Sequence, residues 1–343
     1  MVRLLNNFTR ICKTESGEEY CSCDYRINIY ECPNSEFYVI TGKILVAICI
    51  IQALMAIGSI IYLTRIKKQP FFLPSNRERG WLRPRPLHSY HIIVVSFMFF
   101  QTIHLLALIY ESYPTVAAAE VGNISKNIMG NATAVFYAVS IVYSTPNVKF
   151  NEDYELLYKR SGINTRLVDM IGIILFFLPI VAGVPLASLT GYFAEMNDIK
   201  MANLFFKLYY LFDVVWQMSY LVVLAYFYYK LMIVIRRYVK ILEERGSSDV
   251  VDDDQIEKVK KCTRNITFPV MAIVNGLLFQ SIVLITFGFR PRTITIYYFG
   301  WNLFYYCTEY VAFPLLGFSV ESFLIYHVPS VPSLPSDRKR SNN

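Results

Sequence analysis

The chain has 343 residues, of which 55% are hydrophobic and 17% are charged. A soluble domain carries roughly 25% charged residues, so this composition argues against a soluble protein and indicates a membrane protein. The net charge of +7 lies mostly in connections between apolar segments, which indicates attraction to anionic lipid headgroups and not to nucleic acid.

Residues 1–37 precede the first apolar segment and contain four of the seven cysteines. The distribution of basic residues places this segment on the extracellular or lumenal side, where cysteines oxidise, so we expect two disulfides. A bridge between Cys21 and Cys23 would close a strained ring. This leaves two pairings open, Cys12–Cys23 with Cys21–Cys32 or Cys12–Cys21 with Cys23–Cys32. A zinc site is the alternative, but no histidine accompanies the four cysteines.

Seven later segments have the length of roughly 20 apolar residues that a membrane-spanning helix needs. In lipid the backbone must satisfy its own hydrogen bonds, which favours helices. The sequence therefore predicts an all-α fold, a polytopic bundle of seven transmembrane helices over residues 38–326. The helices are expected at 38–65, 87–111, 127–146, 169–194, 203–235, 265–289 and 295–320.

The orientation of these helices follows from their connections. The first, third and fifth connections carry seven, four and eight Lys and Arg residues, whereas the other three hold only Lys126, Lys200, Arg290 and Arg292. The positive-inside rule then predicts an extracellular N-terminus and a cytoplasmic C-terminus. Glycosylation sequons at Asn7, Asn123 and Asn131 lie on the expected outer side and are predicted to carry glycans.

Two cytoplasmic segments stand out. In residues 236–264 the helical pattern continues through Arg245, ends at Gly246-Ser-Ser, and restarts near Asp252. Two projecting helices would give a docking surface for a cytoplasmic signalling partner, and a solvated charged linker is the alternative. Residues 327–343 form a proline-rich tail that is expected to be disordered.

Polar residues within the apolar segments are candidates for a site, because burying a charge in a membrane costs at least a few kcal/mol. Asp213 and Gln217 are one helical turn apart, and Asn302, Tyr305 and Glu309 share another face. We therefore expect an outward-facing ligand pocket with Glu309 at its floor. The candidate residues are Asp213, Lys207, His104, Trp216, Gln217, Asn302, Tyr305 and Glu309. The alternative is that they join helices together and that Lys207 reaches to the headgroups.

The sequence offers little for catalysis. It contains no metalloprotease, nucleophile-elbow or phosphate-loop motif. His88 and His91 are i, i+3 neighbours without a carboxylate expected at their depth, so no metal is expected. The last helix has no lysine for a retinal Schiff base. We expect neither enzymatic activity nor a cofactor.

Seven helices, an outer N-terminus, basic inner loops and a long fifth connection resemble the G-protein-coupled receptor superfamily over nearly the whole chain. The motifs differ from its largest class: Val142-Tyr-Ser-Thr-Pro146 replaces the Asp/Glu-Arg-Tyr triplet, and the last helix lacks Asn-Pro-x-x-Tyr. Gly80-Trp81 followed by His88 looks like a spacing in the tobamovirus-multiplication-protein-like seven-helix family, over about nine residues. That second resemblance implies a membrane scaffold or an orphan receptor-like role.

These observations predict a receptor, in the plasma membrane or an endomembrane, that senses an extracellular ligand and signals through its cytoplasmic loops. Its expected partners are membrane lipids, that ligand and a cytoplasmic signalling protein. A non-enzymatic scaffold is the first alternative. A small-solute or proton-coupled transporter that uses Asp213 and Glu309 is the second.

Overall fold

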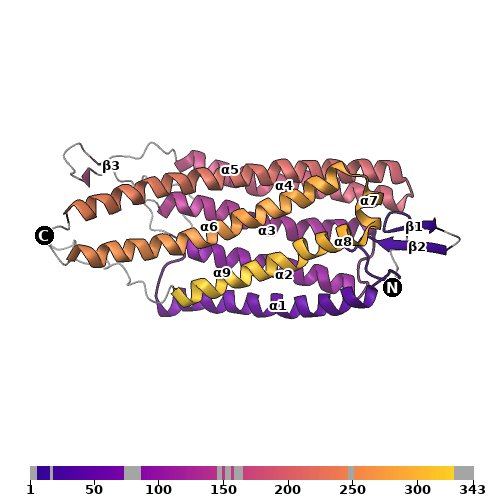
Figure 1. Ribbon diagram of the computed structural model, residues 1–343, viewed down its shortest axis with the longest axis horizontal. Helices are drawn as coiled ribbons and strands as arrows, with labels where there is room; N and C mark the ends of the chain where they lie inside the picture. The colour runs from indigo at the N-terminus through magenta and orange to yellow at the C-terminus, as the bar shows by residue number, and fades with distance from the viewer. Residues whose placement is uncertain are drawn as a thin grey trace.

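The structure, a computed structural model, describes residues 6–15, 18–72, 86–144, 149–150, 156–157, 165–245 and 251–327. The described chain is an elongated bundle of helices, with a small β-hairpin beyond one end, which we call the hairpin end (Figure 1). At the opposite end two helices extend furthest from the bundle. The predicted disordered tail and Gly80-Trp81 lie outside the described residues.

Six segments follow one another as helices: α1 (Ser35–Ile61) with its π-helical extension η1 (Tyr62–Ile66), α2 (Pro86–Ile109), α3 (Val116–Ser144), α4 (Thr165–Glu195), α5 (Ile199–Arg245) and α6 (Val251–Phe289). The last segment is divided into α7 (Arg292–Tyr297), α8 (Phe299–Tyr306), the π-helical turn η2 (Cys307–Ala312) and α9 (Phe313–His327). The strands are β1 (Arg10–Glu15) and β2 (Glu18–Cys23), and the short pair β3 (Lys149–Phe150) and β4 (Leu156–Leu157).

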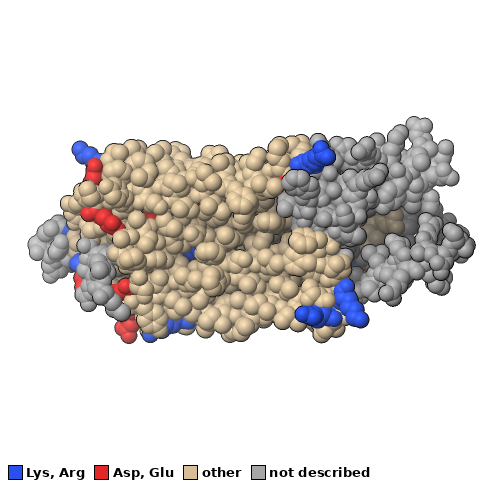
Figure 2. All heavy atoms as spheres, turned by 180° about the vertical axis from the view of Figure 1, so that it is seen from behind, with Lys and Arg blue, Asp and Glu red and all other residues tan. Residues whose placement is uncertain are grey.

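Six helical stretches of the described chain are long and apolar enough to cross a membrane. They are Ser35–Ile66, Leu87–Ile109, Arg166–Glu195, Ile199–Lys240, Val259–Phe289 and Phe299–Tyr326. Large apolar side chains are exposed on their outer faces, among them Leu54, Val181 and Val222, as lipid-facing residues are. Figure 2 shows a broad central belt almost free of Lys, Arg, Asp and Glu, with charged side chains toward both ends. The chain is therefore an integral membrane protein with an all-α membrane domain.

The helix α3 differs from the sequence prediction because it begins at Val116, eleven residues before the expected start at 127. Alanines favour helix in this first stretch, and Thr115 caps it by accepting a hydrogen bond from the Ala118 N–H at 3.1 Å. α3 packs against α2, α4 and α5, and Gly191 allows the α4 backbone to approach the α3 backbone at Ala117. Polar residues of α3 thus face protein and not lipid.

This longer helix corrects two predictions. Asn123 and Asn131 are buried inside the bundle on α3, so their side chains cannot carry the expected glycans. Lys126, which we placed in an outer connection, is a fully buried helical residue. Asn7 is exposed in a turn, and its glycosylation stays a prediction.

The last apolar segment also differs from the expected continuous helix at 295–320. Tyr298 adopts an extended conformation (φ −77°, ψ 112°) between α7 and α8, and the chain passes through the π-helical turn η2 before α9 begins. By contrast, α5 continues to Arg245 and α6 begins at Val251, beyond the expected bounds of 235 and 265, which favours two helices over the charged linker that the sequence left open.

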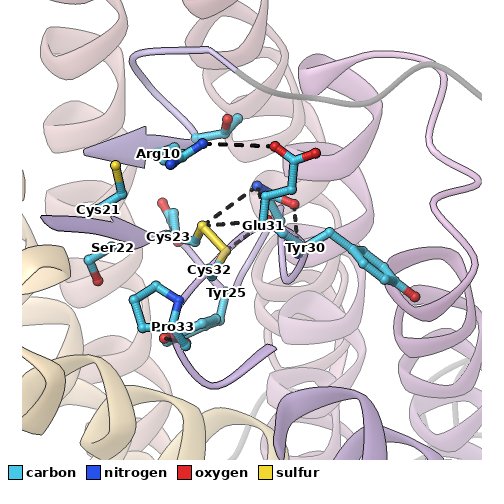
Figure 3. Close-up of a disulfide and its surroundings, with 12 residues drawn as sticks. Arg10, Cys21, Ser22, Cys23, Tyr25, Tyr30, Glu31, Cys32 and Pro33 are labelled. Atoms are coloured by element: carbon cyan, nitrogen blue, oxygen red, sulfur yellow. Dashed lines mark hydrogen bonds and ion pairs between the residues drawn. A yellow bond between two sulfur atoms is a disulfide. The ribbon is translucent and has the colours of Figure 1, made fainter. Parts of the chain in front are cut away.

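The N-terminal segment is held by two disulfides, Cys12–Cys21 and Cys23–Cys32. This is one of the two pairings that the sequence left open. The first joins directly opposed residues of the β1–β2 hairpin. The second closes the loop of residues 23–32, hereafter the N-terminal loop, and an ion pair between Arg10 and Glu31 lies beside it (Figure 3).

The N-terminal loop does not project from the bundle but enters it. Residues 23–29 are all at most 8% exposed, and Tyr25 stacks on Tyr38 of α1 with ring centroids 3.6 Å apart. Asn302 of α8 donates a hydrogen bond to the Cys23 carbonyl at 2.8 Å. The loop therefore belongs to the core of the hairpin end.

Removing the two disulfides is expected to have unequal effects. Both join cysteines nine positions apart, so the loop-entropy model assigns each about 2–3 kcal/mol. Cys23→Ser/Cys32→Ser should lower the midpoint of global thermal unfolding, because the N-terminal loop is packed in the core. Cys12→Ser/Cys21→Ser should change it much less, because the hairpin lies beyond the end of the bundle and contacts α7 there, outside the core that holds the N-terminal loop. Equal shifts in purified protein, followed by circular dichroism, would contradict this assignment.

Candidate functional site

The side chain of Arg26 is the centre of the hairpin end. Its guanidinium donates to both carboxylate oxygens of Glu120 on α3, at 3.0 Å each, and its Nε donates to Asp24 at 2.9 Å. The rings of Phe206 and Tyr210 on α5 lie 4.7 and 5.6 Å from it. Arg26 is 0% exposed. Two carboxylates and two aromatic faces therefore form a closed socket, the Arg26 socket, for one guanidinium group.

A second arginine balances the charges. The Arg292 Nη2 donates to Asp24 at 2.6 Å, and the guanidinium lies 3.5 Å from the ring centroid of Phe8. Two arginines thus face two carboxylates, and the network is neutral. Burial raises the pKa of Asp24, but Arg26 and Arg292 outweigh it and hold this pKa below its ordinary value. Burial lowers the pKa of Arg26, but Asp24 and Glu120 raise it well above the ordinary value.

A second buried charge group lies deeper, because Lys126 follows Glu120 by six residues, or about 9 Å along α3. The Lys126 Nζ lies 3.4 Å from Glu309 Oε2 in η2, donates to Asn127 at 2.9 Å, and lies 4.3 Å from the ring centroid of Tyr310. Asp213 on α5 is close enough for its charge to interact with both Lys126 and Glu309. One lysine therefore faces two carboxylates.

Several acceptors of this deeper group have no hydrogen-bond partner among the described residues. They are Asp213 Oδ2, Glu309 Oε1 and Gln280 Oε1. Buried polar atoms are nearly always satisfied in folded proteins, so each such oxygen calls for an explanation. Three acceptors together in a buried region are suited to a ligand or solvent molecule that donates hydrogen bonds. No group of three or more His, Cys, Asp or Glu suited to a metal occurs in the part of the chain that the structure describes.

His104 on α2 contacts the α2–α3 connection and the last segment. Its Nε2 lies 3.0 Å from the Tyr310 hydroxyl, and its Nδ1 lies 2.6 Å from the Tyr113 hydroxyl. Tyr310 in turn lies 3.3 Å from Asn123 Oδ1. A polar network thus extends from the α2–α3 connection to η2.

The structure brings together most of the residues that the sequence singled out. Four of them lie in the buried core of the hairpin half: Asp213, Glu309, His104 and Tyr305. Gln217 is also buried, one helical turn from Asp213, and accepts a hydrogen bond from Ser281 at 3.1 Å. The remaining three residues lie elsewhere or have other roles.

Lys207 is exposed on the outer face of α5, which contradicts its expected place in the pocket and agrees with the headgroup alternative. Trp216 faces α4, donating to the Leu175 carbonyl at 3.2 Å. Asn302 holds the N-terminal loop, as described above. The first of these differences arises because the helical phase of Lys207 is about 120° from that of Asp213, at 100° per residue.

Sequence analysis missed Arg26, Glu120, Lys126 and Arg292. Arg26 lies in a segment that reads as an ordinary extracellular loop, and the other three lie at the ends of apolar runs. One signal was available: Glu120 and Lys126 follow three alanines in a stretch free of helix breakers apart from Gly122, which favours helix. Their partners come from distant segments, so no local pattern contains them.

Another buried polar contact lies in the opposite half. His91 on α2 pairs with Glu321 on α9 at 2.9 Å, and Ser59 on α1 donates to the same carboxylate at 3.0 Å. His91 therefore has a carboxylate partner, which the sequence did not reveal. The three residues join α1, α2 and α9.

Comparison with known proteins assigns no family to the chain: it matches no protein-family model, no curated protein and no solved structure. The functional argument therefore depends on the geometry of the buried charges and on the arrangement of the helices.

Replacing Lys126 tests the deeper charge group. Lys126→Met should lower the free energy of unfolding by about 3–5 kcal/mol, because Glu309 would be left buried without its partner. Adding Glu309→Gln should recover much of this loss, since no uncompensated charge then remains at that position. Lys207→Met is the matched control and should have little effect. The measurement is thermal or detergent-induced unfolding of the purified protein, and a loss for Lys126→Met as small as that for Lys207→Met would contradict the buried pair.

Proposed function

We propose that the protein is a seven-helix membrane receptor, with an extracellular N-terminus, that binds a small extracellular ligand in the hairpin half of the bundle. The observation that carries this proposal is the column of buried charged and polar side chains from Arg26 down to Asp213 and Glu309. Charged groups inside a membrane domain are costly and are usually functional. Their location beneath an extracellular loop suits a ligand that arrives from outside.

α3 is the seventh spanning helix of this proposal. It has 29 residues, enough to cross a bilayer, and its charged side chains are buried among neighbouring helices. With α3 included, the basic connections alternate sides and the positive-inside rule gives an outer N-terminus. A disulfide-bonded hairpin end supports the same orientation, since disulfides persist in oxidising compartments.

The opposite end offers a surface for a signalling partner. α5 has 47 residues and α6 has 39, and both continue beyond the bundle (Figure 1). A groove between them is lined by Ile235, Val239, Arg236, Lys240 and Lys260. A cytoplasmic protein that detects their relative position would bind there, and resemblance to G-protein-coupled receptors makes a G protein the first candidate.

A proton-coupled transporter is the second candidate. It is favoured by the unpartnered oxygens of Asp213 and Glu309 beside a single lysine, and by the interruptions of the last helix at Tyr298 and η2. A transporter must open the same site to both sides, whereas a receptor need only change its cytoplasmic face. Substrate-dependent proton flux in proteoliposomes would favour this candidate over the receptor.

The orientation has a direct test. An antibody tag at the N-terminus should be accessible on intact cells, whereas a tag after Asn343 should require permeabilisation. Glycosidase treatment should shift the electrophoretic mobility, and Asn7→Gln should abolish the shift because the other outer sequons are buried. Asn123→Gln/Asn131→Gln is the control and should keep it. A shift that survives Asn7→Gln would contradict this orientation.

A second test addresses signalling. Pyrene labels at the exposed positions Glu243 and Lys260, whose side-chain atoms lie 3.8 Å apart, form an excimer while the α5 and α6 extensions stay close. A library of small extracellular compounds should contain one that changes the excimer emission. Asp213→Asn and Glu309→Gln should remove most of that change, because an amide cannot hold the charge that pairs with Lys126. Lys207→Met should retain it. A full response in both carboxylate variants, at normal expression, would show that Asp213 and Glu309 only hold helices together and would contradict their role in the ligand site.

A further inference from the structure

The N-terminal loop fills the place through which an extracellular ligand would enter. Its residues 24–29 occupy the hairpin end between α3, α5 and the last segment, directly above the deeper charge group. We infer that Arg26 is a built-in occupant of the ligand site, and that the extracellular ligand carries a guanidinium group that competes with Arg26 for Glu120. This inference rests on the proposed receptor function and names its ligand class.

The Arg26 socket has the geometry of a guanidinium site. Glu120 accepts two parallel hydrogen bonds of equal length, which matches the planar fork of a guanidinium and not a compact ammonium. Phe206 and Tyr210 add the aromatic faces over which such a cation is bound. Removing Arg26 would leave the carboxylates of Asp24 and Glu120 against Arg292 alone, so the socket would carry a net negative charge.

The N-terminal loop is closed on itself by its own backbone bonds and disulfide. Its backbone bonds at Asp24, Ile27 and Asn28 are made to Thr9 or within the loop. Its contacts with the helices are made by side chains. Arg26, Tyr25, Tyr30 and Asn302 contribute hydrogen bonds and stacking, Asp24 pairs with Arg292, and Ile27 and Ile29 are buried in the core. The Cys23–Cys32 disulfide keeps the loop closed whether or not it is seated. A competitor therefore replaces the Arg26 guanidinium at Glu120 and loosens the packing of a loop that stays closed.

The position of Arg26 at Glu120 also accounts for the role of Lys126 in the deeper charge group. Lys126 lies one layer below Glu120 and repels a second cation, so a guanidinium ligand stops at the Arg26 socket. Its remaining polar groups would then face Asp213, Gln280 and Glu309, whose unpartnered oxygens accept hydrogen bonds. The inferred ligand has a guanidinium at one end and a hydrogen-bond donor at the other.

Hydrogen–deuterium exchange on the full chain in lipid nanodiscs tests this without a mutation. Methylguanidinium should raise the exchange of amides 24–29 severalfold, while amides in the middle of α1 stay unchanged. Methylammonium and sodium chloride at equal ionic strength are the controls and should have no such effect. Unchanged exchange with methylguanidinium, or an equal rise with the controls, would overturn the inference.

The complementary experiment removes the occupant. Arg26→Ala should lower the unfolding temperature by several degrees, and methylguanidinium should restore most of the loss. Restoration should fail in Arg26→Ala/Glu120→Gln, and Arg10→Ala, whose arginine pairs at the edge of the loop, should gain nothing from the compound. Should Arg26→Ala not fold, the exchange experiment still decides the matter. Neither the exchange nor the unfolding experiment depends on signalling. A negative result in them overturns the guanidinium inference but not the receptor proposal, which the label experiment tests. A negative label experiment counts against the receptor proposal but not against guanidinium binding at Glu120.

Discussion

The guanidinium of Arg26 constrains the hairpin half more than any other group. A charge of this kind is strongly disfavoured in a dry interior unless it is paired and fully hydrogen-bonded. Glu120 therefore has to lie on a helix inside the bundle, and α3 has to begin early enough to present it. Arg292 in turn balances Asp24, which requires the chain to turn at α7 and return to the N-terminal segment.

Such networks are weak evidence for stability, because the cost of removing charges from water offsets their attraction. A well-packed apolar replacement would hold the helices equally well. What the network provides is a defined geometry: the two oxygens of Glu120 accept two parallel hydrogen bonds from one planar guanidinium. The two halves of the bundle differ accordingly. The hairpin half holds stacked layers of charge, whereas the opposite half is mainly apolar and contains a cavity of about 70 Å³ between α2, α3, α6 and α9.

The sequence predicted the class of fold well, because the apolar length and the backbone argument act locally. The extensions of α5 and α6 were also readable, since Gly246-Ser-Ser and the three aspartates mark an end and a start. Hydropathy did not reveal the start of α3, because Glu120 and Lys126 interrupt its apolar run. Their partners, Arg26 and Glu309, lie 94 and 183 positions away in the sequence, so no local pattern indicates that the two charges are buried. Asp213 and Glu309 were found as candidates because each interrupts an apolar run. Lys126 was not found, because it was assigned to a connection outside the helices.

The last helical segment connects the two halves. Glu309 lies in η2, where the π-helical turn replaces the tighter α-helical bonding, a feature that recurs at functional sites. Twelve residues further along the same segment, Glu321 pairs with His91 and Ser59. A helix such as α9 is stiff along its axis. A shift of the chain at Glu309 would therefore displace Glu321 and its partners, unless the backbone of η2 changed its conformation and took up the shift. The cavity beside α9, which Gly276 lines, leaves room for such a displacement, whereas Gly317 lets Gln52 of α1 pack against the α9 backbone. The same segment therefore holds one buried carboxylate in each half of the bundle, Glu309 and Glu321, and the first of them lies in the π-helical turn.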